Sequence, residues 1–203
     1  VSLYIFNSND DLNQSNIGLV TDINDDSKSE NIAKSRILVP YPKNDSLFKN
    51  KLITEISSLY IEDMIYGGNF KDVMQNQIML SASEWFIKGL PAYIAENNNN
   101  NQIEKFRKTI LANKKSNIDL VIGENAKIIG QSIWHYIAVK YGKENISNIL
   151  NLTRIIHNEQ ASITSTLGLK YYNFIANWKD YYLNGESDEA ILLNENPATP
   201  IQI

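Results

Sequence analysis

The chain has 203 residues, of which 43% are hydrophobic and 10% aromatic, enough for one folded domain with a sizeable core. The net charge of −4 is small, and the densest basic stretch, 105–115, is interpreted as a solvated helix face, so no nucleic-acid partner is expected. Cysteine is absent, which excludes disulfides and thiolate metal sites, and no run approaches the roughly 18 apolar residues that span a bilayer.

The first 43 residues predict the strands of the fold. Val1–Phe6 alternates and is rich in β-formers, and Ser35–Val39 is a second compact apolar run that two prolines follow. The polar segment between them, Asn7–Lys34, predicts a loop with a helical turn near Asp10–Ser15.

From Asp45 onward the apolar residues recur at the spacing of a helix. Asp45 or Ser46 can cap a first helix, which Gly67 and Gly68 would end. Ser83 can cap a second helix that runs to about Glu96, within which Pro91 predicts a kink or an earlier break. The run Asn97–Asn101 predicts a surface loop.

The remaining sequence is also helical in pattern. Further helices are expected at Gln102–Asn113, Gly123–Tyr141, Lys143–His157 and Leu169–Leu183. The three tryptophans fall on different helices and are core candidates before they are ligand platforms. The fold class is therefore α+β, mostly α: one domain over 1–185, with strands mainly within 1–43 and helices within 45–183, and then a linker, 186–203, to a downstream domain.

The second helix carries a recognisable pattern. Its sequence SEWFIKGLPAYIAE resembles the W-x-x-E-G-L-A-x-Y signature of peptidase MA-like (gluzincin-type) domains, with Trp85, Gly89, Leu90 and Tyr93 in register and Pro91 in place of the alanine. The resemblance implies a gluzincin-like fold in which this helix and the one before it form the walls of an active-site cleft.

The metal ligands of such a site are missing. Lys88 stands where the family carries its third ligand, a glutamate, and the H-E-x-x-H positions hold Thr54, Glu55 and Ser58, so only the motif's glutamate is kept. Helical i, i+4 histidines bind one zinc ion because they project from one face, whereas hydroxyls are poor zinc ligands and an ammonium group repels the cation. We therefore expect no metal, no cofactor and no catalytic residue.

Two further expectations concern the cleft. Lys88 could form an ion pair with Glu55 in the space of the lost metal, or could be solvated on an exposed turn. Trp85, Tyr93 and His135 are possible cleft-lining residues, whereas His135 and His157 lie on different predicted helices and are not expected to bind metal.

The resemblance extends along most of residues 1–185. The opening VSLYIFNSNDDLNQSNIG, the G-x-S-x-W pattern at Gly130, Ser132 and Trp134, and the closing helix with Trp178 are similar to bacterial envelope proteins. In that group a degenerate peptidase MA-like domain precedes a TolB-like β-propeller. The resemblance implies an exported protein, periplasmic or associated with the outer membrane, with a downstream propeller in the same polypeptide.

The function expected from this resemblance is that of a non-catalytic pseudopeptidase domain, a protein-interaction or scaffolding module whose partner is an envelope protein or peptide. Two alternatives stay open. One is an active metallopeptidase or other hydrolase with unorthodox site residues, built on Glu55. The other is a structural cap that shields the propeller and binds no ligand of its own.

Overall fold

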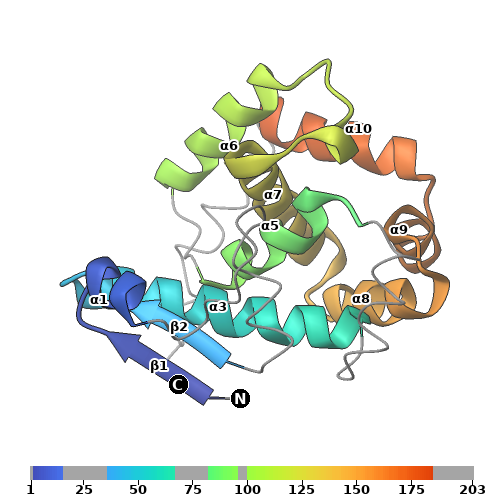
Figure 1. Ribbon diagram of the computed structural model, residues 1–203. Helices are drawn as coiled ribbons and strands as arrows, with labels where there is room; N and C mark the ends of the chain where they lie inside the picture. The colour runs from blue at the N-terminus through green and yellow to red at the C-terminus, as the bar shows by residue number, and fades with distance from the viewer. Residues whose placement is uncertain (1, 16–35, 67–81, 96–99, 185–203) are drawn as a thin grey trace, which may run out of the picture.

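The computed structural model describes residues 2–15, 36–66, 82–95 and 100–184, which are mostly helical with one two-stranded sheet, as the predicted fold class requires. The elements in chain order are β1 (Ser2–Phe6), α1 (Asn9–Gln14), β2 (Arg36–Pro40), α3 (Asp45–Tyr66), α5 (Glu84–Ala95), α6 (Asn100–Ala112), the 3₁₀ turn η1 (Ile118–Leu120), α7 (Gly123–Tyr141), α8 (Glu144–Ile156), α9 (Glu159–Leu167) and α10 (Tyr171–Leu183) (Figure 1).

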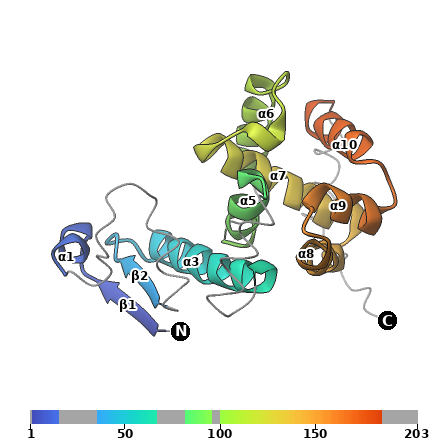
Figure 2. The same cartoon turned by 45° about the vertical axis from the view of Figure 1, so that its right-hand side comes forward.

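The sheet lies at one end of the molecule, beside the start of α3 (Figure 2). Its two strands run parallel, with Leu3 opposite Ile37 and Ile5 opposite Val39. Ile37 and Val39 are buried, whereas the residues of β1 are largely exposed. The predicted helical turn is α1, whose first turn is capped where Ser8 Oγ accepts a hydrogen bond of 3.1 Å from the Asp11 N–H.

Helix α5 continues through Pro91, so the predicted earlier break is wrong. Proline removes one backbone donor, but Pro91 and its neighbours Leu90 and Ala92 are buried, and their packing holds the helix together across the missing bond. The glycines predicted to end α3, Gly67 and Gly68, lie outside the described residues.

Helices α5 and α7 approach each other closely at two glycines. A Cβ atom on Gly130 would lie 1.9 Å from the carbonyl oxygen of Trp85, and one on Gly89 would lie 2.3 Å from the carbonyl carbon of Gly130. Only a residue without a side chain fits at either position. The close contact fixes α5, one wall of the predicted cleft, against the central helix.

The C-terminal helices differ from the prediction at one place. Helices α8 and α10 occupy the predicted ranges to within two residues, but α9 was not among the predicted helices. Asn158 caps α9 by accepting the Ala161 N–H at 2.8 Å, and Gly168 ends it at a φ of 72°. Helix α6 begins at Asn100, inside the predicted loop, and the predicted linker 186–203 lies outside the described residues.

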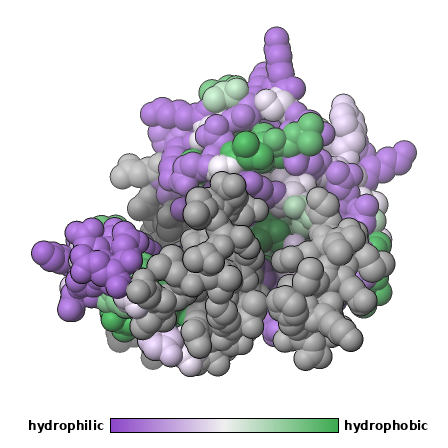
Figure 3. Space-filling model, in the orientation of Figure 1, coloured by the Kyte–Doolittle hydropathy of each residue, from purple (hydrophilic) through white to green (hydrophobic). Residues whose placement is uncertain are grey.

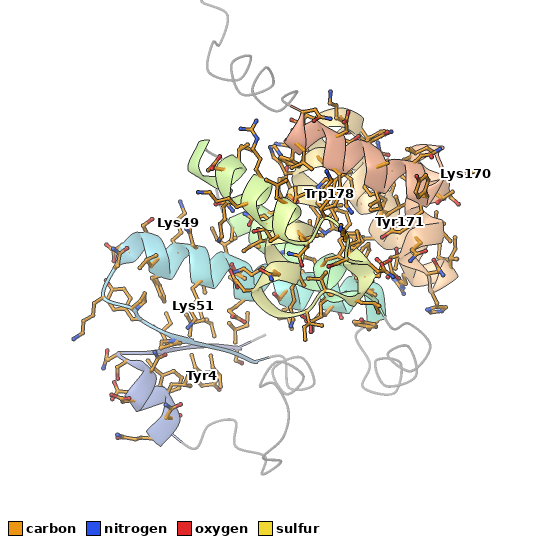
Figure 4. All side chains as sticks on the ribbon, turned by 90° about the horizontal axis from the view of Figure 1, so that it is seen from above. Tyr4, Lys49, Lys51, Lys170, Tyr171 and Trp178 are labelled. Carbon is orange, nitrogen blue, oxygen red and sulfur yellow. The ribbon has the colours of Figure 1, made fainter. Side chains whose placement is uncertain are left out.

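The core lies among the helices, away from the sheet. All three tryptophans, Trp85, Trp134 and Trp178, are fully buried, which confirms their assignment to the core. Figure 4 shows Trp178 among crowded side chains, with Tyr4 apart on the sheet. Hydrophilic side chains cover most of the described surface seen in Figure 3. None of the described helices combines the length and the hydropathy needed to cross a membrane.

Candidate functional site

A cavity of about 620 Å³ lies between α3, α5 and the start of α7. Thr54, Glu55 and Ser58 line it from α3, and Lys88 lines it from α5. The structure thus brings together all four residues that the sequence marks as degenerate active-site positions. The remaining lining residues are mostly polar and include both charges: Asn50, Lys51, Glu62, Ile87, Pro91, Gly123, Glu124 and Lys127.

The α3 wall is built by helical periodicity. Positions 51, 54, 55, 58 and 62 recur at intervals of three and four, so they share one face of the helix. Thr54 donates its hydroxyl proton to the Asn50 carbonyl oxygen at 2.8 Å. The Thr54 hydroxyl oxygen can therefore only accept a hydrogen bond from a ligand in the cavity. Further along the same helix, Ile61 and Ile65 are buried in the core and hold the wall in place.

Lys88 is held within its own helix. Its Nζ lies 2.8 Å from Glu84 Oε2, one turn earlier in α5, and its side chain is 29% exposed. The same carboxylate oxygen accepts the backbone N–H of Gly123 at 2.8 Å, which ties the pair to the start of α7. The expected ion pair with Glu55 is therefore wrong, and so is a solvated lysine on an exposed turn. Lys88 pairs with Glu84 because the two residues are one helical turn apart, so their contact needs no ordering of a long loop.

The cavity holds further charge from α7. Lys127 lies 3.8 Å from Glu124, which is also 3.9 Å from Lys105 of α6. Among the residues that the structure describes, no group of three or more histidine, aspartate or glutamate side chains is placed to hold a metal ion. The arrangement offers fixed hydrogen-bond donors and acceptors on opposite walls.

The three residues named as possible cleft-lining residues do not line this cavity. Trp85 is fully buried, packs against Phe86 and Trp134, and donates its indole N–H to Asp119 Oδ1 at 2.9 Å. Tyr93 is half-buried, with its ring centroid 6.3 Å from that of His135. Both side chains pack against other aromatic residues. The sequence could not show this, since helix periodicity does not reveal which buried face of a helix meets a cleft.

His135 belongs to an aromatic cluster with Phe106 and Tyr182. Tyr182 donates its hydroxyl proton to the Ser132 carbonyl oxygen at 3.1 Å, so the His135 Nδ1–H donates to the Tyr182 oxygen at 2.6 Å. Burial lowers the pKa of His135 to about 4, which keeps the imidazole neutral at pH 7, and burial likewise raises the pKa of Tyr182.

A second polar cluster was missed from the sequence. The Ser83 hydroxyl, expected to cap α5, instead shares its one proton between Glu159 Oε1 at 2.8 Å and Asp119 Oδ1 at 3.3 Å. Asp119 also accepts hydrogen bonds from Trp85, Tyr171 and Gln160. Burial and then the charge of Asp119 raise the pKa of Tyr171.

Four of these residues line a second cavity of about 500 Å³: Ser83, Asp119, Glu159 and Gln160. Nearby, burial followed by the charges of Glu62 and Glu159 raises the pKa of Tyr66 to about 12. The partners are 34 to 76 residues apart in sequence, so no local spacing could have revealed the cluster. Because the Asp119 carboxylate accepts four hydrogen bonds from neighbouring side chains, its evident role is to join α5, η1, α9 and α10.

Comparison with protein-family models, with curated proteins and with solved structures found no match. The resemblance to peptidase MA-like domains therefore stays a prediction from the sequence.

Proposed function

We propose that this chain is a non-catalytic pseudopeptidase domain whose cleft binds a protein or peptide partner without cutting it. The observation that carries the proposal is that Thr54, Glu55, Ser58 and Lys88 line one cavity between two helices. Those positions correspond to the zinc-binding residues and the glutamate of the peptidase signature that the sequence resembles. The bacterial envelope, export and a downstream TolB-like propeller enter the proposal through that resemblance alone.

The chemistry of the cavity favours binding over hydrolysis. The two i, i+4 positions carry hydroxyls, which are poor zinc ligands, and the third carries an ammonium group that would repel a cation. The Glu84 carboxylate and the α7 backbone hold this ammonium in place. A water molecule without a metal ion beside it keeps its high pKa, so Glu55 has no activated nucleophile to serve.

A peptide suits such a cavity because recognition of extended chains depends on main-chain hydrogen bonds and shallow pockets. The lining offers donors and acceptors at several positions along α3, and Lys88 offers donors from α5. Its volume of about 620 Å³ lies within the range of about 300–1,000 Å³ that is usual for binding pockets.

The test rebuilds the metal site. The triple variant Thr54→His, Ser58→His, Lys88→Glu is expected to bind one zinc ion per chain, because it restores two helical histidines and a facing glutamate. The matched control keeps Lys88 and changes only the two α3 positions; it should bind zinc at least about tenfold more weakly, since a ligand is missing and a cation remains. Zinc content after dialysis and calorimetric titration provide the two measurements.

If the triple variant binds zinc no better than the unmodified chain, the three substituted positions do not have the geometry of a metal site and the proposal fails. Stoichiometric zinc in the unmodified chain would instead favour an active metallopeptidase. A peptide hydrolysis that Glu55→Gln abolishes would favour another hydrolase. Cleft substitutions that alter no binding and no phenotype would favour the structural cap.

A further inference from the structure

Six charged side chains of the described residues line the cavity, and two of them, Lys88 and Glu55, face it from different helices without forming an ion pair with each other. Lys88 of α5 takes Glu84 as its ion-pair partner, and Glu55 of α3 forms no ion pair within the part of the chain that the structure describes. Opposite charges that line one cavity attract each other, so their separation leaves space for something that both can bind. A neutral dipole fits this arrangement better than an ion, because one end meets each charge.

The Lys88 ammonium is a positioned donor. One of its three N–H groups is directed at Glu84 Oε2, which Gly123 fixes in turn through its backbone N–H. Two N–H groups remain for a ligand. Because the Glu84 oxygen that anchors the lysine is itself fixed by Gly123, Lys88 loses less rotamer entropy on binding than a free surface lysine would.

Glu55 complements it as an acceptor. Its carboxylate is half-buried on the cavity face of α3, between Thr54 and Ser58. An ionised carboxylate only accepts hydrogen bonds, and the Thr54 hydroxyl proton is already committed to Asn50. Glu55 therefore presents an acceptor from an α3 wall that also carries the Lys51 ammonium, and it does so across the cavity from the Lys88 donor of α5.

We infer that Lys88 and Glu55 are a main-chain-binding pair for an extended peptide: Lys88 donates to a backbone carbonyl oxygen, and Glu55 accepts a backbone N–H. This inference rests on the proposed function and names the groups that carry it out. A peptide unit has one acceptor and one donor on opposite sides, which matches the two walls. Such binding recognises main-chain groups of the peptide and tolerates many different side chains.

The test is an NMR titration of the isotopically labelled chain with acetyl-Ala-Ser-Ala-Ser-Ala-amide, a peptide without terminal charges. Amide shifts should change around positions 54–58 of α3 and 87–91 of α5. Lys88→Met and Glu55→Gln, which keep the size of each side chain, should each weaken binding at least about tenfold, the loss of one hydrogen bond to a charged group. Lys49→Met, on α3 but outside the cavity, should bind as the unmodified chain does.

The outcomes separate this inference from the proposed function. If the capped peptide binds in the cleft and neither Lys88→Met nor Glu55→Gln weakens it, the pair is overturned while a peptide-binding cleft stands. The same peptide with a free C-terminal carboxylate is titrated in parallel. If it binds and the capped peptide does not, Lys88 is an anion site and the pair is again overturned. If neither peptide shifts the cleft residues, the inference fails, and the zinc variant separately decides the origin of the cavity. Thermal unfolding confirms that each variant is folded.

Discussion

Gly130→Ala tests the contact that positions the cleft. Gly130 is buried in α7, and an added Cβ atom would lie 1.9 Å from the carbonyl oxygen of Trp85 and 2.7 Å from its carbonyl carbon. Both obstacles are backbone atoms of α5, so no side chain can turn away to make room. Ordinary contact begins at 3.4 Å, and α5 would have to move from α7 by roughly the 1.5 Å difference.

The size of the destabilisation caused by Gly130→Ala follows from the loss of packing between α5 and α7. A gap of even 0.5–1 Å forfeits about a quarter to a half of each dispersion contact, and Phe86 and Leu90 of α5 are essentially fully buried beside α7. We assign overpacking about 3 kcal/mol, at the upper end of its usual range. Alanine returns about 1 kcal/mol because it favours the helix over glycine. The net loss in the free energy of unfolding is about 2 kcal/mol.

Urea unfolding followed by circular dichroism measures this loss in free energy. In thermal unfolding the same loss should lower Tm by roughly 4–8 °C for a chain of this size. Ser147→Ala, in an exposed position of α8, is the matched control and should be neutral or slightly stabilising. A Gly130→Ala variant as stable as the unmodified chain would refute the reasoning, because it would mean that the two helices do not touch at the backbone.

Three further substitutions test other parts of the structure. His135→Gln should flatten the pH dependence of stability: burial lowers the pKa of His135 from 6.5 to about 4, so the unfolded state binds more protons and the unmodified chain loses up to about 3 kcal/mol as pH falls from 6.5 to 4. An unchanged slope in denaturant titrations would contradict this. Asp119→Asn should cost about 3 kcal/mol, since it weakens four hydrogen bonds to a carboxylate, whereas Asp63→Asn on the exposed face of α3 should cost under about 0.5 kcal/mol. Asn158→Ala should cost about 1 kcal/mol in thermal unfolding by removing the cap of α9, and no loss would mean that the cap is not formed.

The helices that the sequence predicts well are those whose boundaries have local chemical causes. Helix α7 ends at Tyr141, just before Gly142, whose φ of 94° suits glycine, and α10 ends just before Asn184. Helix α9 escaped prediction because its sequence EQASITSTL is rich in serine and threonine, which favour caps and turns over helix interiors. Tertiary packing of Ile163 in the core overrides that local preference.

The strands were predictable as strands but not as partners. Alternation and β-branched residues mark both segments, whereas parallel pairing depends on the path of the chain between them. No local pattern reports that path. The same limit explains the polar cluster around Asp119 of η1, whose helical partners come from three other elements, α5, α9 and α10.

The mistaken partner of Lys88 has a different cause. Glu84 and Lys88 are an i, i+4 pair with the glutamate first, which is the favourable order on a helix, so the sequence already contained the observed contact. The long-range pair with Glu55 was considered because both residues occupy positions of a suspected site. A local partner on the same helix face outweighs such an association unless burial forbids it.

The cleft and the core depend on different residues, and that separation bears on the proposed function. Helix α5 is held by backbone contact with α7 and by Trp85, and α3 is held by Ile61 and Ile65; none of these groups lines the cavity. Charges on the cavity walls are partly solvated and contribute little to stability. Substitutions there change what the cleft binds at small cost to the fold. The proposed loss of a zinc site would therefore have spared the scaffold, and the proposed ligand would contact Lys88 and Glu55.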